Sequence, residues 1–452
     1  MKRFTNACVR YVERLMPDPF LLALILTVIS VVVVFAVVPH ATPSGVTDAW
    51  FSGVWGENNI FAFAFEMVLV LVTGHALAEA PVIRRGLEWL AARPATQVQA
   101  ALLCFGVALV CSFLNWGLGL VSGALLARHI ARRLKGIHFG YLIAASYTGF
   151  IVCNSGLSAS VALANTDPKS PLDVVHTATG HTLSLWRQIG QPSNLVPVVV
   201  LAIAIPFLLA RMVPDHELAP DPAIFEEDEP AAVHERSGFA GAVERFRPLS
   251  LLLVAAGAYA FYLYHFKLDV GSLVMVFTLI GVLLHGTPIR YVRAFTAAAR
   301  SVGPMVLQFP LYGGIIALLG YAPAADVHSL AVRIADGIVS GANATTLPFF
   351  NFLASVVITL FVPSAGGHWG VQGPVAVNAA LAMHQSSPGY LSKIAMSVAA
   401  GESVTNMIQP FWLLPVLALA KLPLRQVMGY TVVMFLVGLV VYGASFLLIP
   451  AL

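Results

Sequence analysis

Apolar segments of membrane-spanning length recur along the chain and are separated by short polar segments. A helix needs about 20 apolar residues to cross the hydrocarbon core of a bilayer. The first apolar segment is longer than a signal-peptide core, so we expect it to be retained as a helix. The pattern predicts spanning helices at 19–38, 59–79, 138–163, 191–213, 248–266, 268–286, 303–321, 388–420 and 426–449.

Two further apolar segments, 96–128 and 346–384, are interrupted at their middle by polar, glycine-rich sequences. These read Cys111-Ser-Phe-Leu-Asn-Trp-Gly-Leu-Gly119 and Pro363-Ser-Ala-Gly-Gly-His-Trp-Gly-Val-Gln-Gly373. We expect each arm to be too short to cross about 30 Å of hydrocarbon. Irregular backbone at a tip is tolerated only inside protein or in a wet cavity. The two segments therefore predict re-entrant helical hairpins.

Composition and the placement of charge indicate a membrane protein and orient it. Hydrophobic residues make up 58% of the chain and charged residues 10%, against about 25% charged residues in soluble domains. The N-terminus and segments 84–93, 128–135 and 290–300 are basic, whereas 39–58 lacks Lys and Arg. Because basic segments stay in the cytoplasm, we interpret them as topology signals rather than ligand sites. We expect a multi-pass protein of the bacterial inner membrane with a cytoplasmic N-terminus and a periplasmic C-terminus.

The two halves of the chain share short sequences in the same order. Asn115-Trp-Gly matches His368-Trp-Gly, and Gly140-Tyr-Leu matches Gly389-Tyr-Leu. Each half then contains span, span, hairpin, span and span. Such internal similarity predicts a repeat architecture.

The predicted repeats divide the chain into a first half at 1–213, a linker at 214–266 and a second half at 267–452. The stretch 214–247 is polar and rich in Pro and Glu, which predicts a flexible cytoplasmic linker. The helix predicted at 248–266 belongs to neither repeat. As a single span between them, it gives the second half the opposite orientation in the membrane. The fold class predicted is an all-α polytopic membrane protein with two inverted-topology repeats, an arrangement typical of secondary transporters.

The helices that follow the hairpins, 138–163 and 388–420, carry polar interruptions and are predicted to be broken. The interruptions read Asn154-Ser-Gly-Leu-Ser-Ala-Ser160 and Gly401-Glu-Ser-Val-Thr-Asn-Met-Ile-Gln-Pro410. Pro and Gly weaken a helix, and the new helix ends offer N–H groups to a carboxylate. Freed carbonyls and Asn or Ser oxygens can hold Na⁺. Without a buried arginine pair, the site suits a monocarboxylate better than a dicarboxylate.

Two ionisable residues in these segments are candidates for ion coupling. Glu402 is an ionisable residue at membrane depth, a functional candidate by default, although it could be a neutral acid bonded to the broken helix. His368 at the hairpin tip could contact substrate, carry a coupling proton or be structural. The Gly and Ser residues could also serve helix packing alone. Glu402 and His368 favour H⁺ as the coupling ion, whereas the freed carbonyls favour Na⁺.

The segments Pro363–Pro374 and Gly401–Trp412, with the opening Met16-Pro-Asp-Pro-Phe20, resemble the short-chain fatty acid transporter family. These AtoE-type permeases belong to the ion transporter superfamily, and the likeness covers essentially the full chain. The resemblance implies uptake of short-chain monocarboxylates such as acetoacetate or butyrate, driven by H⁺ or Na⁺. It also implies an elevator-type mechanism and a homodimer. Neither hairpin has the Ser-Asn-Thr motif of the dicarboxylate branch.

The resemblance also implies which residues form the site. Substrate binding is expected at Asn115, Asn154, Ser155, Ser158, Ser364, His368, Ser403, Thr405 and Asn406. Ion coupling is expected at Glu402, His368, Asn406 and Gln409, and a Na⁺ ion would take Asn115, Asn154 and Asn406.

Other function classes fit the sequence less well. A passive anion channel also uses re-entrant hairpins, but two inverted hairpins in one chain favour alternating access. Gly156-Leu-Ser158 weakly resembles the nucleophile turn of an intramembrane serine hydrolase, and a His-Glu-x-x-His metal motif is absent from the sequence. We expect no enzyme activity, no cofactor beyond the coupling ion and no nucleic-acid partner.

Overall fold

The computed structural model describes residues 7–8, 10, 19–57, 59, 61–166, 168, 170, 172–222, 238–264, 266, 270–300, 302–324, 326–362 and 365–452. This part of the chain is helical, and its β-type pairing is limited to an isolated bridge between His138 and Leu218. The predicted all-α class is therefore confirmed. The predicted linker 214–247 falls, at 223–237, outside the described residues.

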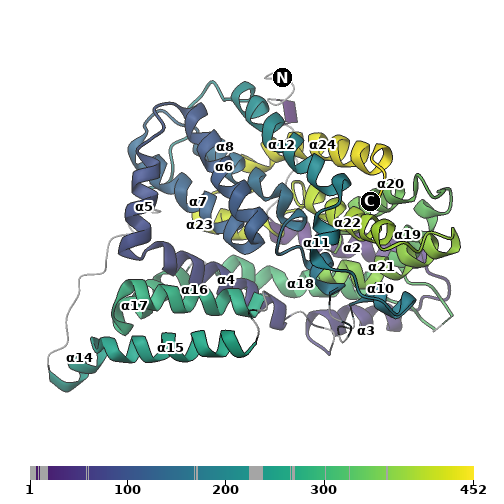
Figure 1. The fold of residues 1–452 in the computed structure, drawn as a ribbon, viewed down its shortest axis with the longest axis horizontal. Helices are drawn as coiled ribbons and strands as arrows, with labels where there is room; N and C mark the ends of the chain where they lie inside the picture. Colours follow the sequence, from purple (N-terminus) through teal and green to yellow (C-terminus); the bar gives the residue numbers. More distant parts are fainter. Residues whose placement is uncertain are drawn as a thin grey trace.

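The first part of the chain contains the first hairpin, the first helix break and the helices before and after them (Figure 1). In chain order they are α2 (Pro19–Val37), α3 (Pro43–Val54), α4 (Phe61–Ala78), α5 (Pro81–Ala91), α6 (Gln97–Leu114), α7 (Trp116–Arg133), α8 (Phe139–Thr148), the 3-10 helix η1 (Gly149–Ser155), α9 (Ser160–Ala164), α10 (Val174–Thr179), α11 (Leu185–Ile189) and α12 (Pro192–Arg211).

The remaining helices begin with a pair in the linker region and continue into the second half. They are α14 (Gly238–Glu244), α15 (Arg247–Leu263), α16 (Val270–His285), α17 (Pro288–Ala299), α18 (Gly303–Gly320), α19 (Leu330–Val339), α20 (Leu347–Thr359), α21 (Ala365–Ala382), α22 (Pro388–Thr405), α23 (Leu413–Ala420) and α24 (Arg425–Leu448).

Among the described residues, 6 helical segments are long and apolar enough to cross a bilayer. Five coincide with predicted spans: Phe20–Val37, Phe139–Ala164, Pro192–Arg211, Gly238–Leu263 and Arg425–Leu448. The other is Gln97–Leu114, the first arm of the hairpin predicted at 96–128. It has 18 residues, or about 27 Å at 1.5 Å per residue, which is close to the roughly 30 Å of a hydrocarbon core. This arm is so long because Asn115 alone forms the turn and leaves the rest of the segment helical. The re-entrant hairpin stays a prediction.

Several amphipathic helices lie in segments that the sequence pattern left as loops. Segment 39–58 contains α3, whose start is capped by the Thr42 hydroxyl accepting from the Gly45 N–H at 3.1 Å, with Pro43 in the first turn. The basic segments 84–93 and 290–300 lie largely on α5 and α17. These helices are only 11 and 12 residues long, so a search for membrane-length apolar runs does not detect them.

The order of helices repeats between the halves. Helices α2 to α5 correspond in order to α16 to α19, the pair α6–α7 to α20–α21, the interrupted helix α8–η1–α9 to α22–α23, and α12 to α24. Contacts exchange in the same way. Helix α4 packs against α16 and α17, and α18 packs against α2 and α3; α5 lies on α7, and α19 lies on α21. The sequence similarity between the halves is thus accompanied by equivalent packing.

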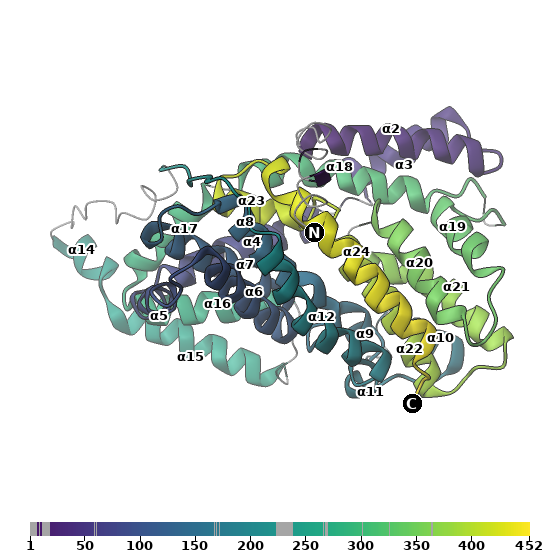
Figure 2. The same cartoon turned by 90° about the horizontal axis from the view of Figure 1, so that it is seen from above.

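The surface of several helices is apolar and exposed. Val28 on α2, Ile203 on α12 and Leu252 on α15 are 63%, 59% and 67% exposed. Figure 2 shows α2, α3 and α18 together at one edge and α15 with α16 at another. Apolar faces of this extent, combined with a core that holds buried polar side chains, indicate a multi-pass membrane protein.

Candidate functional site

The first hairpin turns at a single residue. Asn115 has extended backbone (φ −155°, ψ 126°), and its side-chain oxygen accepts from the N–H groups of Gly117 at 2.9 Å and Leu118 at 3.2 Å. This is an N-cap for α7. A Cβ on Gly119 would lie 1.9 Å from the Ser112 hydroxyl oxygen. Small residues at this crossing let α6 and α7 lie against each other directly behind the tip.

The first helix break is docked onto this hairpin tip. Helix α8 tightens into η1 and stops at Gly156, and the chain becomes α-helical again at Ser160. A Cβ on Gly156 would lie 1.9 Å from the Phe113 carbonyl oxygen, and that oxygen accepts from the Leu157 N–H at 2.9 Å. The Ser158 hydroxyl accepts from the Trp116 N–H at 2.8 Å. The interruption therefore satisfies its polar groups on the hairpin, as buried backbone requires.

The second helix break lies between α22 and α23. The Thr405 hydroxyl donates to the Gly401 carbonyl at 2.8 Å and lies 3.2 Å from the Val356 carbonyl on α20. Gln409 accepts from the Phe411 N–H at 2.8 Å through its side-chain oxygen. Helix α22 ends at Thr405, and Pro410, which cannot donate a helix hydrogen bond, lies in the break before the chain becomes helical again at Leu413.

The two breaks meet in the protein interior. The Asn154 main-chain N–H donates to the Ser403 hydroxyl at 3.3 Å, and the Asn154 side chain hydrogen-bonds the Glu402 carboxyl group. The Tyr147 hydroxyl donates to the Asn406 carbonyl at 2.8 Å. The structure thus brings together Asn154, Glu402, Ser403 and Asn406, which the sequence placed in separate halves.

This meeting point, which we call the polar centre, holds buried polar atoms that have no nitrogen or oxygen hydrogen-bond partner. They are Glu402 Oε2, both side-chain polar atoms of Asn406, and Gln409 Nε2. The Asn406 side chain has only a weak sulfur partner, the Cys153 thiol. All three residues are at most 2% exposed. Most buried polar groups in proteins are paired, so these incompletely paired acceptors and donors, all on the second break, indicate a site for a small polar ligand.

His368 is held inside the second hairpin rather than facing the polar centre. Its Nε2 lies 2.6 Å from Gln372 Oε1, and its Nδ1 lies 3.1 Å from the Thr359 hydroxyl. Gln372 in turn donates to the Asn351 carbonyl at 2.9 Å. Since Gln372 Oε1 can only accept, Nε2 carries the proton and Nδ1 accepts from Thr359. Both ring nitrogens are used within the α20–α21 hairpin.

Most of the other predicted site residues are hydrogen-bonded to groups within the protein. The Ser155 hydroxyl pairs with the Tyr442 hydroxyl at 2.8 Å. The partners of Asn115, Ser158 and Thr405 are those described above. Ser364 lies outside the described residues.

Arg128, which belongs to the basic cluster 128–135, lies in the protein interior. The side chain is 3% exposed and its Nη1 lies 3.3 Å from His75 Nε2, so it joins α7 to α4 in the interior. An arginine at the cytoplasmic end of a span and one buried in the last turns of a helix give the same sequence pattern. Tyr147, which bonds the second break, was not predicted as a site residue, because its role depends on a contact between the halves.

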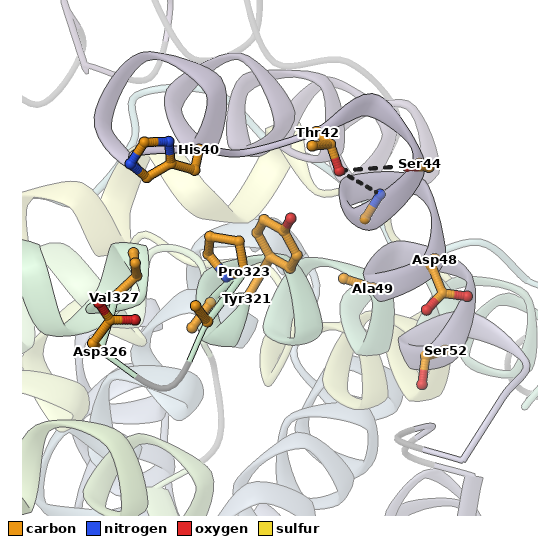
Figure 3. Close-up of a pocket in the computed structure, with 13 residues that line it drawn as sticks. His40, Thr42, Ser44, Asp48, Ala49, Ser52, Tyr321, Pro323, Asp326 and Val327 are labelled. Atoms are coloured by element: carbon orange, nitrogen blue, oxygen red, sulfur yellow. Dashed lines mark hydrogen bonds between the residues drawn. The ribbon is translucent and has the colours of Figure 1, made fainter.

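A separate hollow of about 660 Å³ lies on the surface, between α3 and the loop after α18. Figure 3 shows Asp48 and Ser52 of α3 on one side and Asp326 and Val327 on the other. None of the predicted site residues lines it. Within the described residues, no group of three or more metal-ligating side chains is present. The polar centre, not this hollow, is the candidate site.

Comparison with known proteins decides the family. The family model for short chain fatty acid transporters matches residues 1–449. A relative from Escherichia coli is 34% identical over 461 aligned positions, covering 97% of this chain and 99% of its own. One from Haemophilus influenzae is 31% identical, covering 99% and 100%. Both carry names that assign them to short-chain fatty acid transport. The chain belongs to the short-chain fatty acid transporter family.

The family assignment makes the protein a transporter and not an enzyme, in agreement with the expectation from sequence. Solved structures similar to this chain include the Alcanivorax borkumensis YdaH transporter, with a TM-score of 0.41, 16% identity and coverage of 95% of this chain and 97% of that one. Neisseria gonorrhoeae MtrF gives a TM-score of 0.39 and 15% identity, with 97% of each chain covered.

Proposed function

We propose that this transporter moves short-chain monocarboxylates such as acetoacetate or butyrate together with a coupling ion, and that the substrate binds at the polar centre. The observation that carries the proposal is the set of unpaired buried atoms on Glu402, Asn406 and Gln409. An Asn or Gln amide N–H group is a suitable donor to a carboxylate oxygen. A ligand with one carboxylate uses these donors, and burial excludes the water that would otherwise compete.

Glu402 supports H⁺ as the coupling ion. A substrate carboxylate beside an ionised Glu402 would meet a like charge in a site shielded from water. A proton on Glu402 removes that repulsion and converts the unpaired Oε2 into a donor. Sodium at Asn115, Asn154 and Asn406 is the alternative. The side-chain oxygen of Asn115 already caps α7 and Asn154 already bonds Glu402, which favours the proton.

The repeated helix order and the exchanged contacts support two inverted-topology repeats at 1–213 and 267–452, with 214–266 as the linker. In this arrangement the hairpins α6–α7 and α20–α21 are re-entrant, and their tips and the two breaks lie near the midplane. The hairpins and broken helices form a transport domain that moves, elevator-like, past a scaffold of α2 to α4 and α16 to α18. The basic segments support an inner-membrane protein with its N-terminus in the cytoplasm and its C-terminus in the periplasm.

The exposed apolar faces of the scaffold suit a homodimer embedded in lipid. Superfamily resemblance supports the dimer, because elevator transporters need a fixed body against which the transport domain moves. An alternative function, a passive anion channel, makes a different kinetic prediction: flux that does not saturate and does not show counterflow.

Uptake of labelled butyrate and acetoacetate into proteoliposomes tests the proposed function. An inward pH gradient or an inward Na⁺ gradient is imposed separately, with ionophore controls. We expect saturable uptake above equilibrium driven by the pH gradient, and counterflow when the vesicles are preloaded with unlabelled butyrate. Absence of gradient-dependent uptake for every short acid contradicts the proposal, and accumulation driven by Na⁺ alone replaces the proton with sodium.

A further inference from the structure

An aromatic cluster adjoins the polar centre. The Trp412 and Trp116 rings meet edge to face with centroids 5.2 Å apart, and Phe150 lies 6.0 Å from Trp412. Tyr147 stacks on Phe150 at 5.8 Å. The same Tyr147 bonds the Asn406 carbonyl, so the aromatic cluster (Tyr147, Phe150, Trp116 and Trp412) begins where the unpaired Asn406 amide lies.

Polar and aromatic groups follow each other within the second break. The Gln409 side-chain oxygen accepts a hydrogen bond from the Phe411 main-chain N–H, while the Gln409 Nε2 has no partner. Phe411 and Trp412 follow after Pro410, and their rings lie 5.2 Å apart. A short-chain monocarboxylate has the same division, with a carboxylate head and a tail of a few apolar carbons.

Both tryptophans are held in place from opposite parts of the molecule. Trp116 is the first residue of α7, and its main-chain N–H donates to the Ser158 hydroxyl of the first break. Trp412 packs on Phe411, which itself contacts Phe309 and Tyr312 of α18 with ring centroids 4.8 Å and 5.0 Å away. Trp116 is 9% and Trp412 7% exposed. Closely packed rings with fixed neighbours form a wall that does not yield easily to an extra methylene group.

We propose that Trp412, backed by Trp116, sets the upper limit of acyl-chain length. This inference rests on the proposed function and deepens it. The carboxylate head lies at Asn406 and Gln409, and the tail lies against the Trp412 indole. Acids with a longer tail run into the edge-to-face pair and are rejected, which makes Trp412 a specificity-determining residue.

A chain-length profile tests this inference. Uptake of acids with two, four, six and eight carbons is measured for the wild type, Trp412→Ala and the control Trp186→Ala, whose side chain is 70% exposed. Each buried methylene group changes binding by about fourfold. Hexanoate has two more than butyrate, so filling the enlarged space raises the hexanoate-to-butyrate uptake ratio by about sixteenfold in Trp412→Ala. The control keeps the wild-type ratio. An unchanged ratio in a Trp412→Ala protein that still takes up butyrate overturns the inference.

A second measurement covers the case in which Trp412→Ala does not fold. The milder Trp412→Phe variant is compared with the wild type by quenching of tryptophan fluorescence with 4-bromobutyrate, with excess butyrate as competitor. We expect the butyrate-protected part of the quenching to fall in Trp412→Phe, and equal protected quenching overturns the inference. Wild-type protein that transports no short acid contradicts the proposed function instead, so the two failures are distinguishable.

Discussion

Asn154 and Ser403 join the two halves of the transporter at their helix breaks, with the Asn154 main-chain N–H donating to the Ser403 hydroxyl at 3.3 Å. The Asn154 side chain makes a second link, to the Glu402 carboxyl group. One residue of the first half thus contacts consecutive residues of the second. A ligand that bonds Glu402 or Asn406 would therefore contact groups linked to both halves, as the proposed coupling of an ion to a substrate requires.

Replacing Glu402 by Gln separates coupling from transport. The variant cannot carry a proton on this side chain, but its amide still hydrogen-bonds the substrate and Asn154. We expect accumulation driven by a pH gradient to fall to the equilibrium level, while counterflow of butyrate persists. The control is Glu88→Gln on α5, whose carboxylate pairs with Arg84 at 3.1 Å away from the polar centre. Wild-type pH-driven accumulation by Glu402→Gln shows that Glu402 is not the proton carrier.

A methyl group at Gly156 disrupts the docking of the first break on the hairpin. The added Cβ would lie 1.9 Å from the Phe113 carbonyl oxygen, a backbone atom that cannot move aside. We expect Gly156→Ala to lose about 1–3 kcal/mol of stability, seen as a lower thermal unfolding temperature in detergent, and to reduce uptake. The matched control is Gly106→Ala on α6, where no atom lies within 4 Å. Equal unfolding temperatures for the two variants would show that the break is not seated on the tip.

The contribution of the Asn115 N-cap to stability can be tested separately. Asn115→Ala removes the oxygen that receives the Gly117 and Leu118 N–H groups, and loss of such a cap costs about 1 kcal/mol. Asn115→Asp keeps an acceptor at the same place and is expected to restore most of the unfolding temperature. Recovery of stability without recovery of uptake in Asn115→Asp would indicate that the amide, not only the cap, serves the substrate or a cation.

The sequence predicts helices and breaks well where the signal is local. Gly, Pro, Asn and Ser in an otherwise apolar run mark the interruptions at 154–160 and 401–410, and the structure interrupts both helices there. The amphipathic helices α3, α5, α17 and α19 were missed because they are too short and too mixed in polarity to match a spanning run. Their positions are nevertheless equivalent in the two halves.

The environment of a site residue is less predictable, because it depends on contacts between distant segments. His368 and Asn115 both lie in polar, glycine-rich interruptions of an apolar segment. Both ring nitrogens of His368, however, are hydrogen-bonded to Thr359 and Gln372. Tyr147 sits in an apolar stretch with no local sign that it bonds Asn406 across 259 residues of chain. Arg128 has the position of a topology charge but is buried beside His75. Only the fold reveals these three relationships.

Binding of butyrate to purified protein, measured by isothermal titration calorimetry at acidic and neutral pH for the wild type and Asn406→Ala, tests the central claim most directly. Asn406 contributes both of its side-chain polar atoms to the polar centre, and the side-chain partner of its amide is the weakly bonding Cys153 thiol. We predict that wild type binds butyrate and that Asn406→Ala binds at least about tenfold more weakly, a loss of about 1.4 kcal/mol, with an unchanged unfolding temperature. Wild-type affinity in Asn406→Ala would place the substrate elsewhere and contradict the account.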